Sequence, residues 1–291
     1  MSQPLTSEGP RPVPVRSVRT RRIAFAYPPA ALDRHYVRGD LVMSHVVSVL
    51  SAMFPEGEDF FVRSVRHYAD RVTDSELKKQ VAGFIGQEVT HGREHGALNE
   101  RLQEMGYPTR RVDRMVKAGL KRNERLFPHK VQLAITAALE HYTAALAETL
   151  LTDPRAQELL GENEVRSMLL WHALEESEHK AVAFDVYQHV VGDEKLRIRT
   201  MRFMTVAFIF AVVGHSVLSL LGDRASYDLR RLGRSLAALR HSPFLTREVA
   251  RRINDYNRVG FHPDDHDATE LLERWREELF GEEGRLADHV K

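Results

Sequence analysis

Two stretches decide the fold: residues 84–95 read FIGQEVTHGREH, and residues 171–187 read WHALEESEHKAVAFDVY. Each contains a glutamate followed three residues later by a histidine, namely Glu88 with His91 and Glu176 with His179. At about 100° per residue, each pair falls on the apolar face of its own predicted helix. Charges buried there are costly unless something neutralises them, and a metal ion is the usual reason to gather several.

Two further helical segments each place one carboxylate on an apolar stripe. Residues 54–61 (FPEGEDFF) carry Glu58, and residues 138–144 (ALEHYTA) carry Glu140. The order along the chain is therefore Glu, Glu-x-x-His, Glu, Glu-x-x-His on four successive helices, which is the ligand order of ferritin-like di-metal carboxylate bundles. We predict an all-α, ferritin-like four-helix bundle with additional N- and C-terminal helices. Its predicted metal ligands are Glu58, Glu88, His91, Glu140, Glu176 and His179.

A buried ion-pair network between helices is the alternative explanation for these residues. Such a network needs cationic partners, but the inward stripes around Glu58, Glu88 and Glu140 contain no Lys or Arg. Only Lys180, about 40° from Glu176 around the helix, is a candidate. The shortage of cations favours a metal site.

Two more histidines lie one helical turn from the motifs. His95 follows His91 by four residues, and His172 precedes Glu176 by four. Because the second and fourth helices of such a bundle run antiparallel, both rings are expected on the same side of the metal layer. We predict a catalytic role for His95 and His172, as extra ligands, as donors to the ligands or as a proton relay. Ordinary core histidines are the alternative.

The four quoted stretches resemble a bacterial family catalogued as predicted metal-dependent hydrolases and regarded as ferritin-like. The resemblance covers roughly residues 20 to 280. It implies a metal-dependent activity, and the family name implies hydrolysis.

The predicted ligand set suits two iron ions, or manganese, better than zinc, because hard oxygen donors dominate it. Sites of this kind commonly activate dioxygen. Our first hypothesis is therefore an oxidoreductase acting on an apolar or amphiphilic small-molecule substrate, with an electron donor as partner. The alternatives are a two-metal hydrolase, as the family name implies, and a non-catalytic, ferroxidase-like or metal-binding protein.

Composition excludes several other classes. The chain of 291 residues contains no cysteine, which rules out disulfides, thiolate nucleophiles and iron–sulfur clusters. Its net charge of +1 gives no bulk electrostatic reason to bind nucleic acid. The N-terminal stretch has no apolar signal-peptide core, so the cytoplasm is the expected location.

We divide the chain into four parts. Residues 1–22 are expected to be a disordered basic arm, 23–192 the di-metal bundle and 225–291 amphipathic helices. Between them, 193–224 should form an apolar helix, because 203–221 contain no formally charged residue. That helix is expected to be buried beside the bundle or to form a homodimer, with membrane contact as the alternative.

Overall fold

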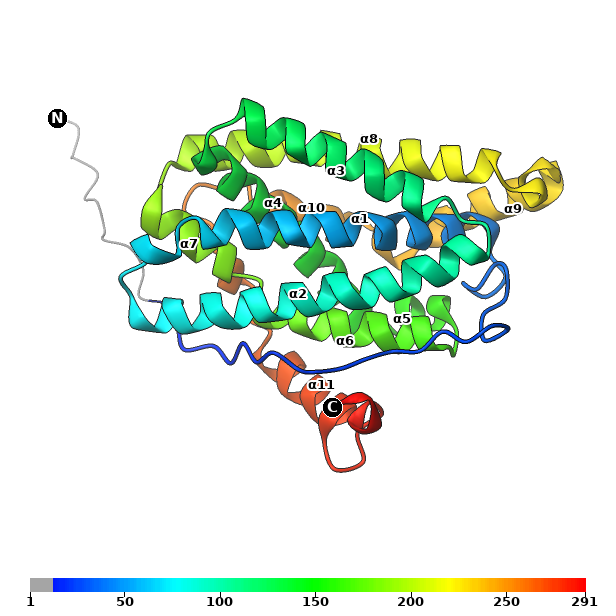
Figure 1. Ribbon diagram of the computed structural model, residues 1–291, viewed down its shortest axis with the longest axis horizontal. Coiled ribbons are helices and arrows are strands. Elements are labelled where there is room, and N and C mark those ends of the chain that lie inside the picture. The colour runs from blue at the N-terminus through cyan, green and yellow to red at the C-terminus, as the bar shows by residue number, and fades with distance from the viewer. Residues whose placement is uncertain (1–12) are drawn as a thin grey trace.

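The computed structural model describes residues 13–291, and helices dominate that part of the chain (Figure 1). The all-α prediction is confirmed, since the described residues contain only one isolated bridge, between Ile23 and Val290. The α-helices are α1 (Leu41–Arg66), α2 (Ser75–Glu104), α3 (Thr109–Leu126), α4 (His129–Thr152), α5 (Pro154–Leu160), α6 (Glu164–His179), α7 (Val182–Val190), α8 (Glu194–Leu221), α9 (Leu229–Ala238), α10 (Arg247–Asp255) and α11 (Thr269–Phe280).

Four helices carry the predicted ligands and pack on one another. Helix α1 lies along α2, α4 lies along α6, and further contacts join α1 to α4 and α2 to α6. One apolar cluster, which includes Leu98 and Trp171, fills one part of this core. A second cluster, which includes Phe84 and Tyr187, fills another. Along α2, and again from α6 into α7, the polar motif has residues of one apolar cluster before it and residues of the other after it. Apolar packing therefore fixes the helices on both sides of each motif.

Helix boundaries follow local sequence signals. The side chain of Asp40 accepts a hydrogen bond from the Met43 amide and caps the start of α1, and Asp74 caps α2 in the same way. Helix α1 continues through Pro55, so Glu58 lies in the middle of one long helix. Helix α6 ends at His179, and two turn residues separate it from α7.

The prediction of a disordered arm over residues 1–22 is wrong for residues 13–22, whereas 1–12 lie outside the described residues. The chain from residue 13 runs along the bundle to α1 (Figure 1). Arg16 pairs with Asp185 at 2.7 Å, and Arg21 pairs with Glu175 and Glu178, each at 2.8 Å. Pro and Arg content suggested disorder, but these arginines have buried carboxylates as partners and are therefore held in place.

The apolar helix α8 packs on α1 and α4 with one side only. Its inward residues include Arg197 and Met201 at one end and Ser216 and Ser219 at the other. Only 11% of its most apolar 18-residue window is buried. The expectation that this helix is buried is therefore wrong for its outer side, which faces away from the rest of the described chain.

The remaining C-terminal chain forms short helices, as expected. Helix α9 lies near the end of α8, α10 packs on α4, and α11 packs on α6 and α4. Helices α10 and α11 thus cover α4 and α6, and α11 brings Arg276 to Glu178.

Candidate metal centre

The structure brings all six predicted ligands together between α1, α2, α4 and α6. Their side chains are buried, and Glu176, the least buried, is 4% exposed. His179 Nε2 lies 3.1 Å from Glu88 Oε1 and 3.3 Å from Glu140 Oε2. His91 Nδ1 lies 3.6 Å from the same Glu88 oxygen and 3.5 Å from Glu176 Oε1.

Glu88 occupies the centre of this arrangement. Its carboxylate belongs to one compact group with Glu58 and His91 and to another with Glu176 and His179, and the ligand atoms of each group lie within 4.8 Å of one another. One carboxylate from each motif thus lies between the two imidazoles. These residues could therefore hold two metal ions.

The ligand atoms of these residues lack other partners. Both oxygens of Glu58, Glu88 and Glu140 are buried without a hydrogen bond. The same holds for Glu176 Oε2, His91 Nδ1 and His179 Nε2. Buried polar atoms are nearly always satisfied, so nine such atoms on six neighbouring residues need a common partner. Divalent metal ions fit this set of oxygen and nitrogen donors.

The electrostatics of the metal-free protein show the cost of the arrangement. Burial, followed by the charge of Glu88, raises the pKa of Glu58 well above its usual range. Burial, followed by Glu88 and Glu176, raises the pKa of Glu140 to about 8. Burial alone would also raise the pKa of Glu176, but the imidazoles, His179 first, hold it well below its usual value.

The pKa values of the two motif histidines shift upward, whereas burial lowers the pKa of most imidazoles. Burial opposes their charge, yet surrounding carboxylates raise the pKa of both His91 and His179 well above the usual range. Protons therefore take the place of cations in the metal-free protein. Metal binding must displace them, which makes affinity rise with pH.

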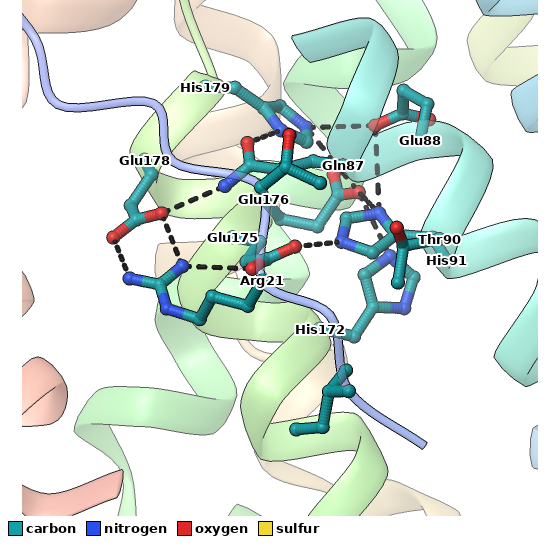
Figure 2. Close-up of polar contacts among 12 residues, drawn as sticks. Arg21, Gln87, Glu88, Thr90, His91, His172, Glu175, Glu176, Glu178 and His179 are labelled. Carbon is teal, nitrogen blue, oxygen red and sulfur yellow. Dashed lines mark hydrogen bonds and ion pairs between the residues drawn. The ribbon is translucent and has the colours of Figure 1, made fainter. Parts of the chain in front are cut away.

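A second layer of side chains orients the two imidazoles (Figure 2). His91 Nε2 donates to Glu175 Oε2 at 3.1 Å, which leaves its Nδ1 facing the cluster. His179 Nδ1 donates to Gln87 Oε1 at 2.9 Å, which leaves its Nε2 facing the cluster. Such partners fix the ring and its tautomer and raise ligand basicity. Each partner directly precedes a metal-motif glutamate and supports the histidine of the other helix.

Arginines from two distant segments, Arg21 before α1 and Arg276 of α11, support this second layer. Gln87 Nε2 donates to Glu178 at 2.9 Å. Glu178 also accepts from Arg21 and Arg276, each at 2.8 Å, and Arg21 donates in addition to Glu175. Two arginines thus neutralise two buried carboxylates, and Figure 2 shows Arg21 between Glu175 and Glu178. Lys180, the cation considered from the sequence, pairs with Glu148 at 2.9 Å instead.

The structure also brings His95 and His172 together, on the same side of the cluster. His95 Nε2 and His172 Nδ1 lie 2.7 Å apart, and His172 Nε2 lies 2.9 Å from Glu176 Oε1 and 3.7 Å from Glu58 Oε1. Burial lowers the pKa of His172 to about 4 and that of His95 well below its usual range, so both are neutral.

Neighbouring polar groups determine which nitrogens of this pair carry protons. Asn99 Nδ2 donates to the Ser51 carbonyl at 3.0 Å, so Asn99 Oδ1 must accept from the Ser51 hydroxyl at 2.8 Å. Ser51 Oγ then accepts from His95 Nδ1 at 2.9 Å. A neutral His95 therefore accepts at Nε2 from His172 Nδ1, and His172 presents the lone pair of Nε2 to the carboxylates. Two acceptors facing each other need a cation between them.

Sequence reasoning missed Glu175, Gln87, Glu178 and Arg21. The angular rule placed Glu175 and Glu178 away from the stripe, whereas both are buried. The repeated pattern Gln-Glu-x-x-His and Glu-Glu-x-x-His was the available signal. Arg21 had no local signal, because its partners lie more than 150 residues away.

Comparison with known proteins adds a family. Searches of curated proteins and of solved structures find no match. The ferritin-like assignment therefore stays a prediction that rests on the four ligand helices. The profile of one family, described as predicted metal-dependent hydrolase, matches residues 19–267, which include every candidate ligand. The chain, with its converging glutamate and histidine side chains, belongs to this family of predicted metal-dependent hydrolases.

Proposed function

We propose that this protein is a dinuclear metal-dependent hydrolase acting on a small-molecule substrate. The observation that carries the proposal is the set of nine buried donor atoms, from four glutamates and two histidines, that have no hydrogen-bond partner. The family description favours hydrolysis over dioxygen activation, which we put first on the ligand set alone. Divalent ions bound there would supply the Lewis acidity that metal-dependent hydrolysis requires.

The residues divide into two ligand groups in this proposal. Glu58, Glu88 and His91 would hold one ion, and Glu140, Glu176 and His179 would hold the other. Four carboxylates balance the charge of two divalent ions. Oxygen donors outnumber nitrogen donors, so iron and manganese fit better than zinc.

His172 adds a third imidazole to this set. Its Nε2 lone pair faces Glu176 at 2.9 Å, which suits two ligands of the same ion. His95 acts as a positioning residue, because its hydrogen bond with His172 Nδ1 selects the tautomer that can bind metal. This division replaces the shared catalytic role that the sequence suggested for the two histidines.

Metal content of the variants tests the ligand assignment without any assay of activity. Glu88→Ala should lose both ions, because its carboxylate contacts both imidazoles. His172→Ala should bind the ion beside Glu176 more weakly, whereas His95→Ala should keep two ions and show an altered metal spectrum. Unchanged metal content in Glu88→Ala would overturn the site. Equal affinity in His172→Ala and the wild type would remove His172 from the ligands.

Activity is tested by turnover of chromogenic esters and phosphate esters. The wild type should hydrolyse at least one class after loading with manganese or iron and lose turnover after chelation. Glu148→Gln is a matched control for folding effects, because Glu148 is also a buried carboxylate of α4 but pairs with Lys180. Turnover that persists in a metal-free Glu88→Ala variant would refute metal-dependent hydrolysis by this site.

A dioxygen-activating oxidoreductase is the second candidate, favoured by the four-carboxylate composition of the ligand set. It would require an electron donor as a partner. Anaerobic loading with ferrous iron followed by exposure to air separates the two functions. Rapid oxygen uptake with a new visible absorption band, and no ester turnover with any metal, would favour this candidate over hydrolysis.

A further inference from the structure

The outer side of α8 is an unusually apolar surface. We define the outer face of α8 as Phe203, Val206, Phe210, Val213, Val217 and Leu221. The exposed fractions of these side chains run from 48% at Val217 to 74% at Phe210. The helix is long and apolar enough to cross a membrane, and its most apolar window has a mean hydropathy of 2.1. An exposed stripe of this kind marks an interaction surface.

The other side of α8 is fixed to the protein at both ends. Near its start, fully buried Arg197 donates to the Tyr256 carbonyl and, at 2.8 Å, to the Arg258 carbonyl. Near its end, Ser219 Oγ bonds His45 Nδ1 at 2.7 Å. Helix α8 also contacts α1 and α4. The helix therefore stays on the bundle, and only its outer face is free to meet a partner.

Basic residues border this outer face. Arg199 and Arg202 precede the apolar stretch and Arg224 follows it, and all three are exposed. Helix α3, which also packs on α1, has seven Lys or Arg residues against two acidic ones. Arg111 of α3 is close enough to α8 to contribute, after burial, to the lowered pKa of His215. Helices α3 and α8 follow the same edge of the molecule (Figure 1).

We propose that the outer face of α8 docks on the surface of an anionic lipid bilayer, with the helix axis parallel to the membrane. Apolar side chains enter the boundary between headgroups and acyl chains, while the bordering arginines and α3 meet lipid phosphates. A second copy of the chain complements the apolar stripe but not its border, because self-pairing brings basic rims together. A membrane of negative charge complements both.

Further exposed apolar residues follow the C-terminal end of α8. Tyr227 and Leu229, just after α8, are 69% and 78% exposed. An amphipathic ring such as that of Tyr227 suits the headgroup level. Docking in this orientation would bring the bundle to a surface where amphiphilic molecules are concentrated.

Vesicle co-sedimentation tests the proposal. The probes are vesicles of phosphatidylcholine alone and vesicles of equal parts phosphatidylcholine and phosphatidylglycerol. The wild type should bind the second kind and be released by high salt. Phe210→Glu should lower partitioning roughly tenfold or more, the factor that burial of one phenylalanine side chain is worth. Arg111→Gln with Arg114→Gln should lower it by roughly fivefold or more, and only on anionic vesicles.

Val259→Glu is the matched control, because Val259 is also exposed, at 78%, but lies in the loop after α10. It should bind vesicles as the wild type does, and circular dichroism melting should show that every variant folds. Equal binding by Phe210→Glu and the wild type would overturn the proposal. A wild-type dimer that Phe210→Glu converts to a monomer, without vesicle binding by either, would assign the face to a second copy. Recovery from membranes only with detergent would indicate a span instead.

Discussion

Replacing Glu140 by glutamine should stabilise the metal-free protein and destabilise the metal-loaded protein. The Glu140 carboxyl group is 1% exposed, and neither oxygen has a hydrogen-bond partner. Burial and the nearby carboxylates raise its pKa from 4.5 to about 8. At pH 7 the group is ionised in the unfolded chain and mostly protonated in the folded one, which costs about 3 kcal/mol of folding free energy. Glutamine does not ionise, so the expected gain is roughly 2 kcal/mol or more.

The stability gained by Glu140→Gln should depend on pH. Because the folded pKa is above the unfolded one, the penalty is absent below about pH 4.5 and grows until about pH 8. At pH 5 the gain should therefore shrink to about 1 kcal/mol or less. Urea unfolding of chelator-treated protein at the two pH values measures both gains. Loading with metal should reverse the order of stability, because the variant lacks one anionic ligand.

Glu148→Gln serves as the control on the same helix. Glu148 is also buried but pairs with Lys180 at 2.9 Å and with Arg252. Removing one partner of a buried pair costs about 3 to 5 kcal/mol, so this variant should be less stable with and without metal. A metal-free Glu140→Gln protein less stable than the wild type at pH 7, or a gain equal at both pH values, would refute the reasoning.

Three further predictions concern the support of the site and the fold. Glu175→Gln should weaken metal affinity by about 10- to 100-fold, because the imidazole it orients loses a charged acceptor; equal affinity in a chelator competition would contradict this. Gly92→Ala should lower metal affinity, since a Cβ there would lie 3.2 Å from Glu58 Oε2. Gly96→Ala on the same helix meets nothing within 4 Å and should keep it, so equal losses would count against the close approach. Burial lowers the pKa of His45 to about 4, so the wild type should lose up to about 3 kcal/mol as pH falls from about 6.5 to about 4. His45→Gln should lose less over that interval, and parallel urea midpoints in the two proteins would argue against a neutral buried imidazole.

The helical periodicity of the sequence was sufficient to predict the ligand helices and the convergence of six ligands. A charged residue in the middle of an apolar stripe has few physical explanations, so Glu58 and Glu140 could be found although each is a single residue. Antiparallel helices were expected to place His95 and His172 on one side of the site, and the structure has their rings within hydrogen-bond distance. These features depend on local spacing, which the sequence contains directly.

Features that depend on distant partners could not be predicted in this way. Arg21 looks like part of a disordered arm until its contacts with Glu175 and Glu178 are known. Helical angles place Glu178 off the ligand stripe, but they do not show that another chain segment covers that side. The exposure of α8 was missed for the same reason, since its composition suits burial, dimerisation and membranes equally.

The meeting of Arg21 and Arg276 at Glu178 has a consequence for biosynthesis. The last candidate ligand is His179, but Arg276 is synthesised about 100 residues later. Until then, Gln87, which holds His179, donates to a Glu178 carboxylate that has only Arg21 as a cationic partner. Nascent chains would therefore carry every candidate ligand before its support is complete, and firm metal retention should begin only after α11 has packed on α6. Deleting α11, or replacing Arg21, should speed metal loss even though every candidate ligand remains.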